Sequence, residues 1–368
     1  MTVLDELIQE LCPDGVKYKA LGEICKLVTG ATPSKTNAAY WENGTIPWMS
    51  SGEVNLKRVA ATEKKITQLG YEKNSTTIVP KHSVVIALAG QGKTRGKAAI
   101  TEIELCTNQS LCSMICNENL DYKFLYYILD GKYEELRAIS NGDGTRGGLS
   151  LKILAPYKIP VPPLPVQREI VRILDNFTEL TAELTAELTA RKKQYAYYRD
   201  KLLSTNNSSV PVVELRDIVK KSCSGATPAK GNAEYYENGT IPWIRTQDVR
   251  FNEITEVNSY ITEKAVSETA TKWIPENCVI VAISGATAGR CAINKIKATT
   301  NQHCLNLIID DSMALYRYVF HCLCSKYEEL ISRKQGARGD LNSSLILSLP
   351  IPIPSLEVQK RLVEVLDN

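Results

Sequence analysis

The sequence contains the same unit twice, and matching positions lie 192 to 195 residues apart. The motifs that carry this repeat occur in the same order in both copies, which excludes a chance match. They are Gly30-Ala31-Thr32-Pro33 with Gly225-Ala226-Thr227-Pro228, residues 40–48 with 235–243, Asn108-Gln109 with Asn301-Gln302, residues 132–136 with 326–330, Arg146-Gly147 with Arg338-Gly339, and residues 159–168 with 351–360. Self-similarity of this kind indicates duplicated structural units. We therefore expect two domains with one fold.

The order of expected elements is also shared, and it predicts a mixed α/β (α+β) domain in each copy. Short apolar runs bounded by turn residues indicate strands, and Asp121 is well placed to cap a helix that carries Phe124 and Leu125 on its apolar face. The expected elements are opening strands over 21–28 and 215–219, buried strands over 83–89 and 279–284, and helices after 121 and over 316–330.

Residues 165–204 predict one long amphipathic helix, roughly 58 Å in length at 1.5 Å per residue. Its apolar residues alternate four and three positions apart, which is the heptad pattern of a helix that packs along another helix. This row of residues, which we call the seam, consists of Val166, Ile170, Ile173, Phe177, Leu180, Leu184, Leu188, Tyr195, Tyr198 and Leu202. In its middle, Glu-Leu-Thr-Ala occurs three times over 179–190. Each repeat adds about 6 Å of helix, so the repeat number could set a distance. The alternative is that these residues are simply good helix formers.

The domain boundaries follow from these elements. The first domain covers 1–157, the long helix 158–205, the second domain 206–349, and the start of a second long helix 350–368. Asn368 aligns with Asn176, so the second copy lacks most of the helix that follows the first. We expect this truncation to leave the seam uncovered and to favour self-association or dependence on a partner.

Composition narrows the class of protein. The 368 residues carry a net charge of +3, which permits nucleic-acid binding without requiring it. The eleven cysteines include no Cys-x-x-Cys pair, and no apolar run is long enough to span a membrane. The first residues lack the features of a signal peptide. We expect reduced thiols in a cytoplasmic protein.

Residues 87–94 match the relaxed phosphate-binding loop pattern, but we interpret the match as a coincidence. The pattern requires a helix directly after its Lys-Thr, whereas Arg95-Gly96-Lys97 follows here, and the second copy has no Gly-Lys-Thr. The alternative is a glycine-rich hairpin that presents Lys93, Arg95 and Lys97 in the first copy and Arg290 in the second. Such side chains suit contacts with phosphate or guanine.

Other polar residues differ between the copies inside a shared frame, as two readers of different DNA sequences would require. Ser50 and Ser51 follow Ile-Pro-Trp in the first copy, and Arg245 and Gln247 follow it in the second. Arg reads guanine and Gln reads adenine in the major groove, although divergent surface loops look the same. The remaining candidates are Lys35, Asn108, Gln109, Arg146, Lys230, Asn301, Gln302 and Arg338. The four amides could equally be turn-holding groups.

No constellation of catalytic residues is recognisable. The three histidines, at 82, 303 and 321, form no metal-ligand pair, and no Gly-x-Ser-x-Gly motif occurs. We therefore predict a chain that is not an enzyme by itself and has neither a catalytic residue nor a metal site. Two further hypotheses stay open at this point: a helical scaffold that does not read DNA, and a nucleotide-dependent enzyme that uses residues 87–94.

The doubled Gly-x-Thr-Pro and Ile-Pro-Trp motifs, the Ile-Pro-x-Pro-Pro-Leu-x-x-Gln-Arg segment at 159–168 and residues 195–203 resemble the specificity subunit of type I restriction-modification systems. The resemblance covers essentially the whole chain. It implies two target recognition domains joined by long helices that form an antiparallel coiled-coil spacer. Each domain would bind one half of a split, asymmetric site in double-stranded DNA.

The resemblance also implies partners. Two methyltransferase subunits would dock on the helices and bring S-adenosylmethionine, and restriction subunits would bring ATP and magnesium. This chain would bind no cofactor itself.

Overall fold

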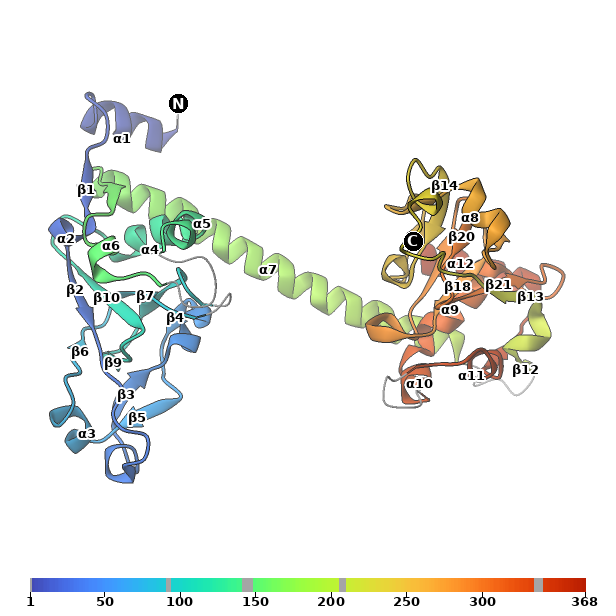
Figure 1. The fold of residues 1–368 in the computed structure, drawn as a ribbon, viewed down its shortest axis with the longest axis horizontal. Coiled ribbons are helices and arrows are strands. Elements are labelled where there is room, and N and C mark those ends of the chain that lie inside the picture. The colour runs from blue at the N-terminus through green and yellow to red at the C-terminus, as the bar shows by residue number, and fades with distance from the viewer. Residues whose placement is uncertain (1, 91–93, 141–147, 205–209, 334–339) are drawn as a thin grey trace. The chain divides into compact units, whose positions relative to one another are not determined.

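The computed structural model describes residues 2–90, 94–140, 148–204, 210–333 and 340–368. The chain divides into two units, Met1–Thr185 and Ala186–Asn368. Each unit holds one copy of the sequence repeat (Figure 1). The boundary between the units falls inside the long helix.

The first unit is built on two sheets with the strand orders β2-β10-β7-β8-β4 and β5-β3-β9-β6, and β1 pairs with β11. Its strands are β1 (Tyr18–Ala20), β2 (Cys25–Thr29), β3 (Ile46–Met49), β4 (Arg58–Val59), β5 (Lys64–Ile66), β6 (Ile78–Val79), β7 (Val84–Ala87), β8 (Ala98–Thr101), β9 (Leu105–Thr107), β10 (Leu111–Cys116) and β11 (Lys158–Pro160). Its helices are α1 (Val3–Leu11), α2 (Leu21–Ile24), α3 (Gln68–Glu72), α4 (Tyr122–Gly131), α5 (Tyr133–Ala138), α6 (Leu151–Leu154) and the first part of α7 (Leu164–Leu203), with short 3-10 helices η1 (Ala38–Tyr40) and η2 (Ser51–Leu56).

The second unit repeats this topology strand for strand, with the orders β13-β21-β18-β19-β15 and β16-β14-β20-β17 and the pair β12-β22. Its strands are β12 (Val212–Glu214), β13 (Val219–Ser224), β14 (Ile241–Ile244), β15 (Glu253–Ile254), β16 (Tyr260–Ile261), β17 (Trp273–Ile274), β18 (Val279–Ala282), β19 (Cys291–Asn294), β20 (Ala298–Thr300), β21 (Cys304–Ile309) and β22 (Pro350–Pro352). Its helices are α8 (Glu263–Glu268), α9 (Tyr316–Ser325), α10 (Tyr327–Ser332), α11 (Ser343–Leu347) and α12 (Leu356–Asp367), with the 3-10 helices η3 (Leu215–Ile218), η4 (Ala233–Tyr235), η5 (Thr246–Asp248) and η6 (Gly285–Thr287).

The buried apolar runs form the centre of each larger sheet, as the sequence predicts. Every residue of β7 and of β18 is buried. In the first unit, Val84 and Ile86 face the core that α4 and α7 cover, whereas Val85 and Ala87 face a second core together with Met49. Because side chains alternate along a strand, one four-residue run supplies both cores.

In each unit, one buried glutamine joins the helix that follows the domain to the start of a neighbouring helix: α7 to α4 in the first unit, and α12 to α9 in the second. Gln167, on α7, accepts a hydrogen bond from the Asp121 backbone N–H at 2.8 Å and donates to the carbonyls of Asn119 and Pro162. Gln359, on α12, makes the same three contacts with Leu315, Met313 and Pro354. An amide buried in this way must have its partners, since an unmet polar group in a core costs about 1–3 kcal/mol. The glutamine of the repeated Val-Gln motif therefore has a structural role in both units.

The helix after Asp121 is confirmed, and two other expectations are wrong in detail. The Asp121 carboxylate accepts hydrogen bonds from the backbone of Lys123 and Phe124 and so caps α4. The opening strands begin only at Cys25 and Val219, after one helical turn each. Both apolar residues of each turn are buried, at a spacing of three: Leu21 with Ile24, and Leu215 with Ile218. That spacing fits a helical turn and not a strand, in which neighbours alternate.

The helix expected over 316–330 is interrupted. The backbone leaves the helical region at Lys326, where ψ is 13°, so that α9 ends at Ser325 and α10 begins at Tyr327. The same break occurs at Lys132 between α4 and α5, with the same ψ. After the break, Leu136 and Leu330 are both buried in their cores. The interruption thus belongs to the repeated fold.

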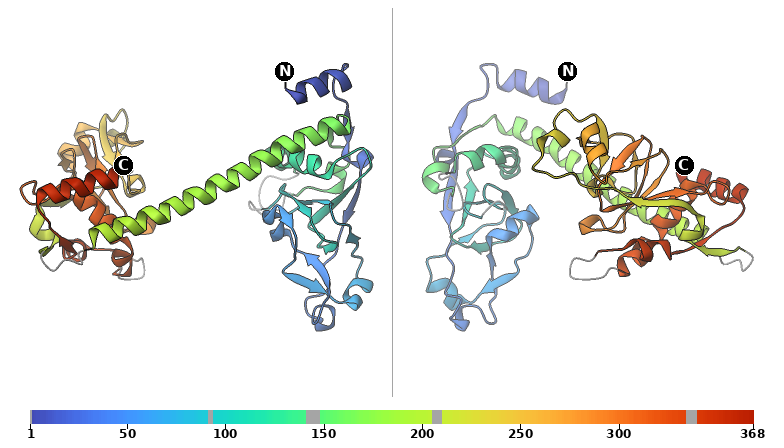
Figure 2. Two further views of the ribbon diagram at one scale, coloured as in Figure 1. Left: turned by 180° about the vertical axis from the view of Figure 1, so that it is seen from behind. Right: turned by 45° about the vertical axis from the view of Figure 1, so that its right-hand side comes forward.

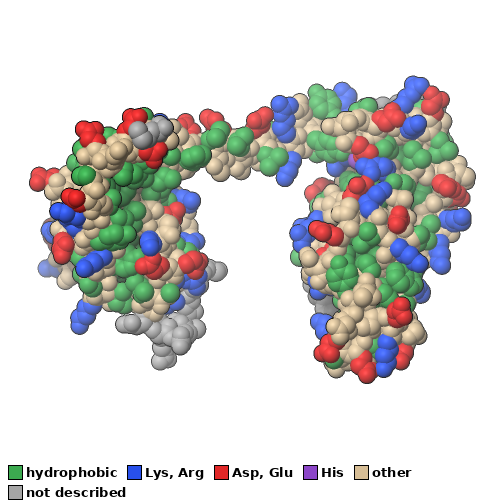
Figure 3. Space-filling model, turned by 90° about the horizontal axis from the view of Figure 1, so that it is seen from above, with side chains coloured by type: hydrophobic (Ala, Val, Ile, Leu, Met, Phe, Trp, Pro, Cys, Tyr) green, Lys and Arg blue, Asp and Glu red, His purple; other side chains and the backbone are tan. Residues whose placement is uncertain are grey.

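Helix α7 has 40 residues and begins and ends within a residue of the predicted range. Its first turns bury Val166 and Val171 in the core of the first unit, and Leu203 is buried in the core of the second. Residues 176–195 between them are all exposed. Hydrophobic side chains of the seam therefore lie at the surface along the middle of α7 (Figure 3). Figure 2 shows the course of the same helix from two further sides. Among the helices that the structure describes, none is long and apolar enough to cross a membrane.

Candidate nucleic-acid interface

In each unit, the repeated motifs meet where two parallel strands end. In the first unit β3 and β9 run parallel, with Met49 opposite Thr107. The Asn108 backbone N–H donates to the Met49 carbonyl at 3.1 Å, so Ser50 and Asn108 leave the sheet side by side. In the second unit β14 and β20 place Arg245 and Asn301 in the same way. The carboxyl ends of parallel strands are a common place for ligand-binding side chains.

The Gly-x-Thr-Pro loop is fitted against this same edge. A Cβ atom on Gly30 would lie 1.7 Å from the Thr107 carbonyl oxygen, and one on Gly225 would lie 1.8 Å from that of Thr300. The loop is then fastened from its other side, because the Thr32 hydroxyl donates to Gln109 Oε1 at 2.5 Å, and Thr227 donates to Gln302 likewise. Only glycine permits this close approach of two backbones.

Aromatic side chains hold the rest of the loop. The indole of Trp48 donates to the Ala31 carbonyl at 2.9 Å, and the indole of Trp41 donates to the Ser34 carbonyl at 3.0 Å. In the second unit Trp243 and Tyr236 bind the carbonyls of Ala226 and Pro228. The aromatic residues of the repeated segments 40–48 and 235–243 therefore support this loop. The loop in turn presents Lys35 in the first unit and Lys230 in the second, both exposed.

Two further segments reach the same place from the larger sheet. The Leu88 backbone N–H at the end of β7 donates to the Ser110 carbonyl, and the Leu88 carbonyl accepts from Leu149, both at 2.8 Å. The hairpin β7–β8, the turn at 108–110 and the segment after residue 147 thus converge. Ile283, His303 and Leu341 make the corresponding contacts in the second unit.

The candidate residues of the first unit lie on these converging segments, and several have internal partners. Ser50 donates through both its backbone N–H and its hydroxyl to Glu53 Oε2, at 2.6 and 2.8 Å, and Ser51 begins η2. The Lys97 ammonium donates to Asn55 Oδ1 at 2.8 Å, which ties the hairpin to η2. Arg95 is half-buried beside them. The structure therefore brings hairpin and strand-end candidates together.

Arg245 is the most distinctive candidate of the second unit. Its guanidinium lies over the ring of Trp243, 5.9 Å from the ring centroid, and its backbone N–H donates to Asp248. Its Nε atom is buried, and within the described residues it has no hydrogen-bond partner. Gln247 is exposed on η5, and Arg290 is half-buried at the β18–β19 hairpin.

The two repeated asparagines show the turn-holding geometry that the sequence left as an alternative. Asn108 Oδ1 accepts from the Ser110 backbone N–H at 3.0 Å, and Asn301 Oδ1 accepts from that of His303 at 3.1 Å. Gln109 and Gln302 fasten the Gly-x-Thr-Pro loops, as described above, yet both stay exposed. Their reading of bases stays a prediction.

Three candidates, Lys93, Arg146 and Arg338, lie outside the described residues. The phosphate-loop match at 87–94 is followed by a turn and then by β8, with no helix between Thr94 and Ala98. β7 and β8 pair in an antiparallel hairpin. The expected hairpin is thereby confirmed, and its contacts with phosphate or guanine stay a prediction.

Lys64 and Lys65 are additional basic residues at this surface that the sequence did not single out. With Lys35, Trp41 and Glu63 they line a shallow depression of about 430 Å³. They lie near Lys35 because β5 pairs with β3. The sequence analysis did not predict the pairing of β3 with β5. A prediction of that pairing would have placed Lys64 and Lys65 beside Lys35.

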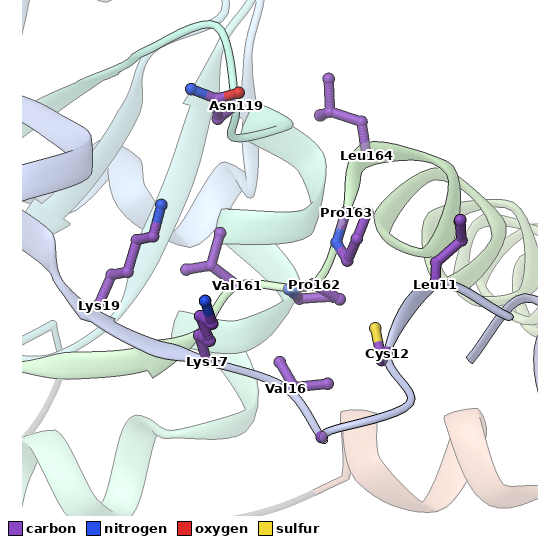
Figure 4. A pocket seen from close by; sticks show the side chains of 11 residues that line it. Leu11, Cys12, Val16, Lys17, Lys19, Asn119, Val161, Pro162, Pro163 and Leu164 are labelled. Atoms are coloured by element: carbon purple, nitrogen blue, oxygen red, sulfur yellow. The ribbon is translucent and has the colours of Figure 1, made fainter. Parts of the chain in front are cut away.

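A separate cavity of about 340 Å³ lies in the first unit beside the start of α7. It is lined by the end of α1, by β1 and by the Pro162–Leu164 segment that leads into α7, with Lys17 and Lys19 among its side chains (Figure 4). None of the candidate DNA-binding residues lines it.

Comparison with known proteins assigns the family. The model described as "Type I restriction modification DNA specificity domain" matches residues 13–191 and again 207–368. The chain is 31% identical to the Type I restriction enzyme EcoR124I/EcoR124II specificity subunit of Escherichia coli, over all of this chain and 89% of that protein. It is 26% identical to the MjaIX specificity subunit of Methanocaldococcus jannaschii, over 92% and 84% of the two chains.

Solved structures agree on the fold. The S subunit of a type I restriction-modification system from M. genitalium matches with a TM-score of 0.55 at 16% identity, over 96% of this chain and 90% of that one. A chain from a study of complex assembly in the type I system matches with a TM-score of 0.65 at 17% identity, with the same coverage.

The duplicated fold and these matches together define a DNA specificity component. The chain belongs to the type I restriction-modification DNA specificity family. It is thus the non-catalytic part of such a system, whose partners are DNA and the other subunits. The resemblance inferred from the sequence is confirmed, and the comparisons give no support to a scaffold that does not read DNA.

Proposed function

We propose that each unit reads one half of a bipartite, asymmetric DNA site through the segments that converge at its parallel strand ends. The observation that carries this proposal is that both units share one supporting structure but hold different side chains at one of its positions. The two units share the fastened Gly-x-Thr-Pro loop and its aromatic supports, but Ser50 in the first is replaced by Arg245 in the second. A common frame with exchanged polar groups is what two readers of different sequences require.

The candidate residues divide by chemistry. Lys35, Lys230, Arg95, Lys97 and Arg290, with Lys93, Arg146 and Arg338, supply positive charge for phosphates and guanine. Arg245 and Gln247 with Ser50, Ser51 and the four amides are the groups that would meet base edges. Phosphate contacts position a protein on DNA, and contacts with base edges carry its specificity.

The long helix serves as spacer and docking surface in this proposal. The exposed seam from Phe177 to Leu202 requires a cover, because apolar rows of this kind mark protein interfaces. Two methyltransferase subunits would cover it and carry S-adenosylmethionine, and restriction subunits with ATP and magnesium would complete the complex in the cytoplasm. A second helix antiparallel to α7 would complete a coiled-coil spacer.

The first experiment is genome-wide adenine methylation in cells that contain this chain and its methyltransferase partner. A split motif that disappears when the gene is deleted is the expected result. No motif at all, from a complex that assembles, would refute the proposal and return the scaffold hypothesis.

The variant Arg245→Lys tests the assignment of halves. Loss of the planar guanidinium should weaken discrimination at one base pair by about 1–3 kcal/mol, roughly 5- to 150-fold. The change should be confined to one half of the motif. Ser50→Ala is the matched variant at the equivalent position and should act on the other half only. An effect of either variant on both halves would contradict the assignment.

A further inference from the structure

At the root of α7, one carboxylate joins three elements of the first unit. Asp175 accepts a hydrogen bond from the Lys123 ammonium at 2.6 Å and another from the Tyr127 hydroxyl at 2.6 Å, both from α4. The Arg58 guanidinium of β4 lies 3.7 Å from the same carboxylate. Strand, helix α4 and helix α7 therefore share one cluster of charges, which we call joint 1.

The second unit has a joint at the same place with different side chains. Asp367, on α12, accepts from the Arg317 Nε atom at 2.6 Å and contacts the His321 Nε2 atom at 2.9 Å, both from α9. Arg317 also bonds Glu253 of β15. Joint 2 consists of these four residues.

Position by position, the joints correspond through the sequence repeat. The matched pairs are Asp175 with Asp367, Lys123 with Arg317, Tyr127 with His321, and Arg58 with Glu253. Only the carboxylate on the long helix is identical. The strand residue has reversed its charge: in joint 1 the strand residue Arg58 contacts Asp175 and, at 2.9 Å, Glu102, whereas in joint 2 Arg317 of α9 bonds both Asp367 and the strand residue Glu253. Two different solutions that fasten the same three elements indicate that the fastening matters, not the residues that make it.

Both carboxylates are held in their charged form. Partial burial alone would raise the pKa of Asp175, but the hydrogen bonds from Lys123 and Tyr127 outweigh it, and the pKa is lowered from 3.8. The pKa of Asp367 is lowered in the same way by Arg317 and His321, against the effect of burial. The joints are therefore ionic and directional at neutral pH.

Joint 1 lies where α7 leaves the first unit, so it can set the direction in which the exposed part of the helix continues. Hydrogen bonds of Gln167 fix the first turn, and the apolar contacts of Ile170 and Val171 that follow it have no direction, so they restrain tilt of the helix only weakly. Asp175 is the last residue of the helix with partial burial before the exposed stretch that begins at residue 176. A tilt of about 6° there would move a point about 30 Å further along the helix by about 3 Å. That is close to one base-pair step of about 3.4 Å.

We propose that Asp175 and Asp367 are positioning residues that fix each recognition domain on the helix that follows it, α7 or α12, and that this fixing makes the complex accept a single spacing between its half-sites. The proposal about spacing rests on the proposed function. Neither residue touches DNA in this role. The half-site sequences are read elsewhere in each unit, so the joint acts on the geometry between readers and not on reading.

The first test needs no DNA. Spin labels are attached through ketone-bearing residues at the exposed positions 26, on β2, and 183, on α7, in the full chain. We expect a narrow distance distribution in the parent and at least a twofold broader one in Asp175→Ala and in Lys123→Met. The double variant Lys123→Arg/Tyr127→His imports the α9 side chains of joint 2 and should stay narrow. Arg172→Ala removes an ion pair within the same helix and is the matched control. Unchanged widths in all variants would overturn the joint.

The second test measures spacing in methylated genomes. Asp175→Ala should extend methylation to sites with one base pair more or less between unchanged half-sites, whereas Arg172→Ala should not. Loss of folding would lower methylation at all sites equally and would not create new spacings. Broadened distances with strict spacing would overturn the spacing proposal alone. The absence of any split motif in the parent would instead refute the proposed function, and the label distances would still decide the joint.

Discussion

At the scale of single residues, the two copies show which positions serve the fold and which are free to change. Gly30 and Gly225 lie against a carbonyl where no side chain fits, and Gln167 and Gln359 make identical buried contacts. Ser50 and Arg245 occupy one position of that frame with unrelated chemistry. Duplication thus separates structural residues from candidate readers inside one sequence.

The variant Gly30→Ala should destabilise the chain by about 2 kcal/mol or more, because its methyl group would overlap the Thr107 carbonyl and force the two backbones apart. Thermal unfolding should show a midpoint several degrees lower. The control is Gly131→Ala, at the end of α4, where an added Cβ would meet nothing within 4 Å. That change should be neutral or stabilising by about 0.5–1 kcal/mol. Equal effects of the two changes would show that the close approach is not what requires glycine.

The sequence predicted much of this scale and missed a definite part. Repeated motifs identified Gly30, Trp48 and Gln109 as important, but their partners lie 17 to 77 positions away in the chain and emerge only from strand pairing. The charged clusters of the joints were not foreseen at all. Each combines residues from three elements, and between the copies only the aspartate is identical, so no repeated motif revealed them.

At the scale of elements, α7 was the most predictable. Its heptad spacing and its length follow from local sequence, and both ends match the structure within a residue. The one-turn helices α2 and η3 were mistaken for strands, since a run of four apolar and polar residues fits either period. Their identity is decided by two buried side chains three positions apart, which is a tertiary fact.

Deleting Glu183–Ala186 should shorten α7 by about 6 Å and shorten the accepted spacer between half-sites by one or two base pairs. Both half-site sequences should stay as they are. Replacing the same four residues by alanines keeps the helix length and should leave the spacer unchanged. The measurement is the number of base pairs between the half-sites in the methylated motifs of the two strains. An unchanged number after the deletion would show that the number of repeats does not set this distance.

At the scale of the whole chain, the two units are alike in fold, and we expect them to differ in their response to acid. Tyr127 and His321 occupy equivalent positions, but only the histidine titrates near neutrality. Burial lowers the pKa of His321 from 6.5, although the hydrogen bond to Asp367 opposes this, and Arg317 and Arg199 lower it further. The folded second unit therefore keeps a neutral imidazole that the unfolded chain would protonate.

Stability of the second unit should consequently be complete above about pH 6.5 and fall as the pH decreases from there through the lowered pKa. The variant His321→Tyr, which copies the first unit, should lose less thermal stability between pH 7.5 and pH 5.5 than the parent. His303→Gln removes an exposed histidine and should change nothing. The quantity compared is the difference between the two pH values, so a uniform shift in stability caused by the larger ring does not matter. A parental pH dependence that survives His321→Tyr would assign the effect to another group.

Threonine hydroxyls bond the helix backbone within the repeats of α7 and directly before them. The hydroxyls of Thr178, Thr181 and Thr185 each donate to the carbonyl four residues earlier, those of Leu174, Phe177 and Thr181. Such bonds compete with the backbone ladder and bend helices gently. The repeats that hold Thr181 and Thr185 therefore add curvature as well as length. A chain with more such repeats would be longer and more curved, so the distance between the ends of its helix should grow by less than the length of helix that is added.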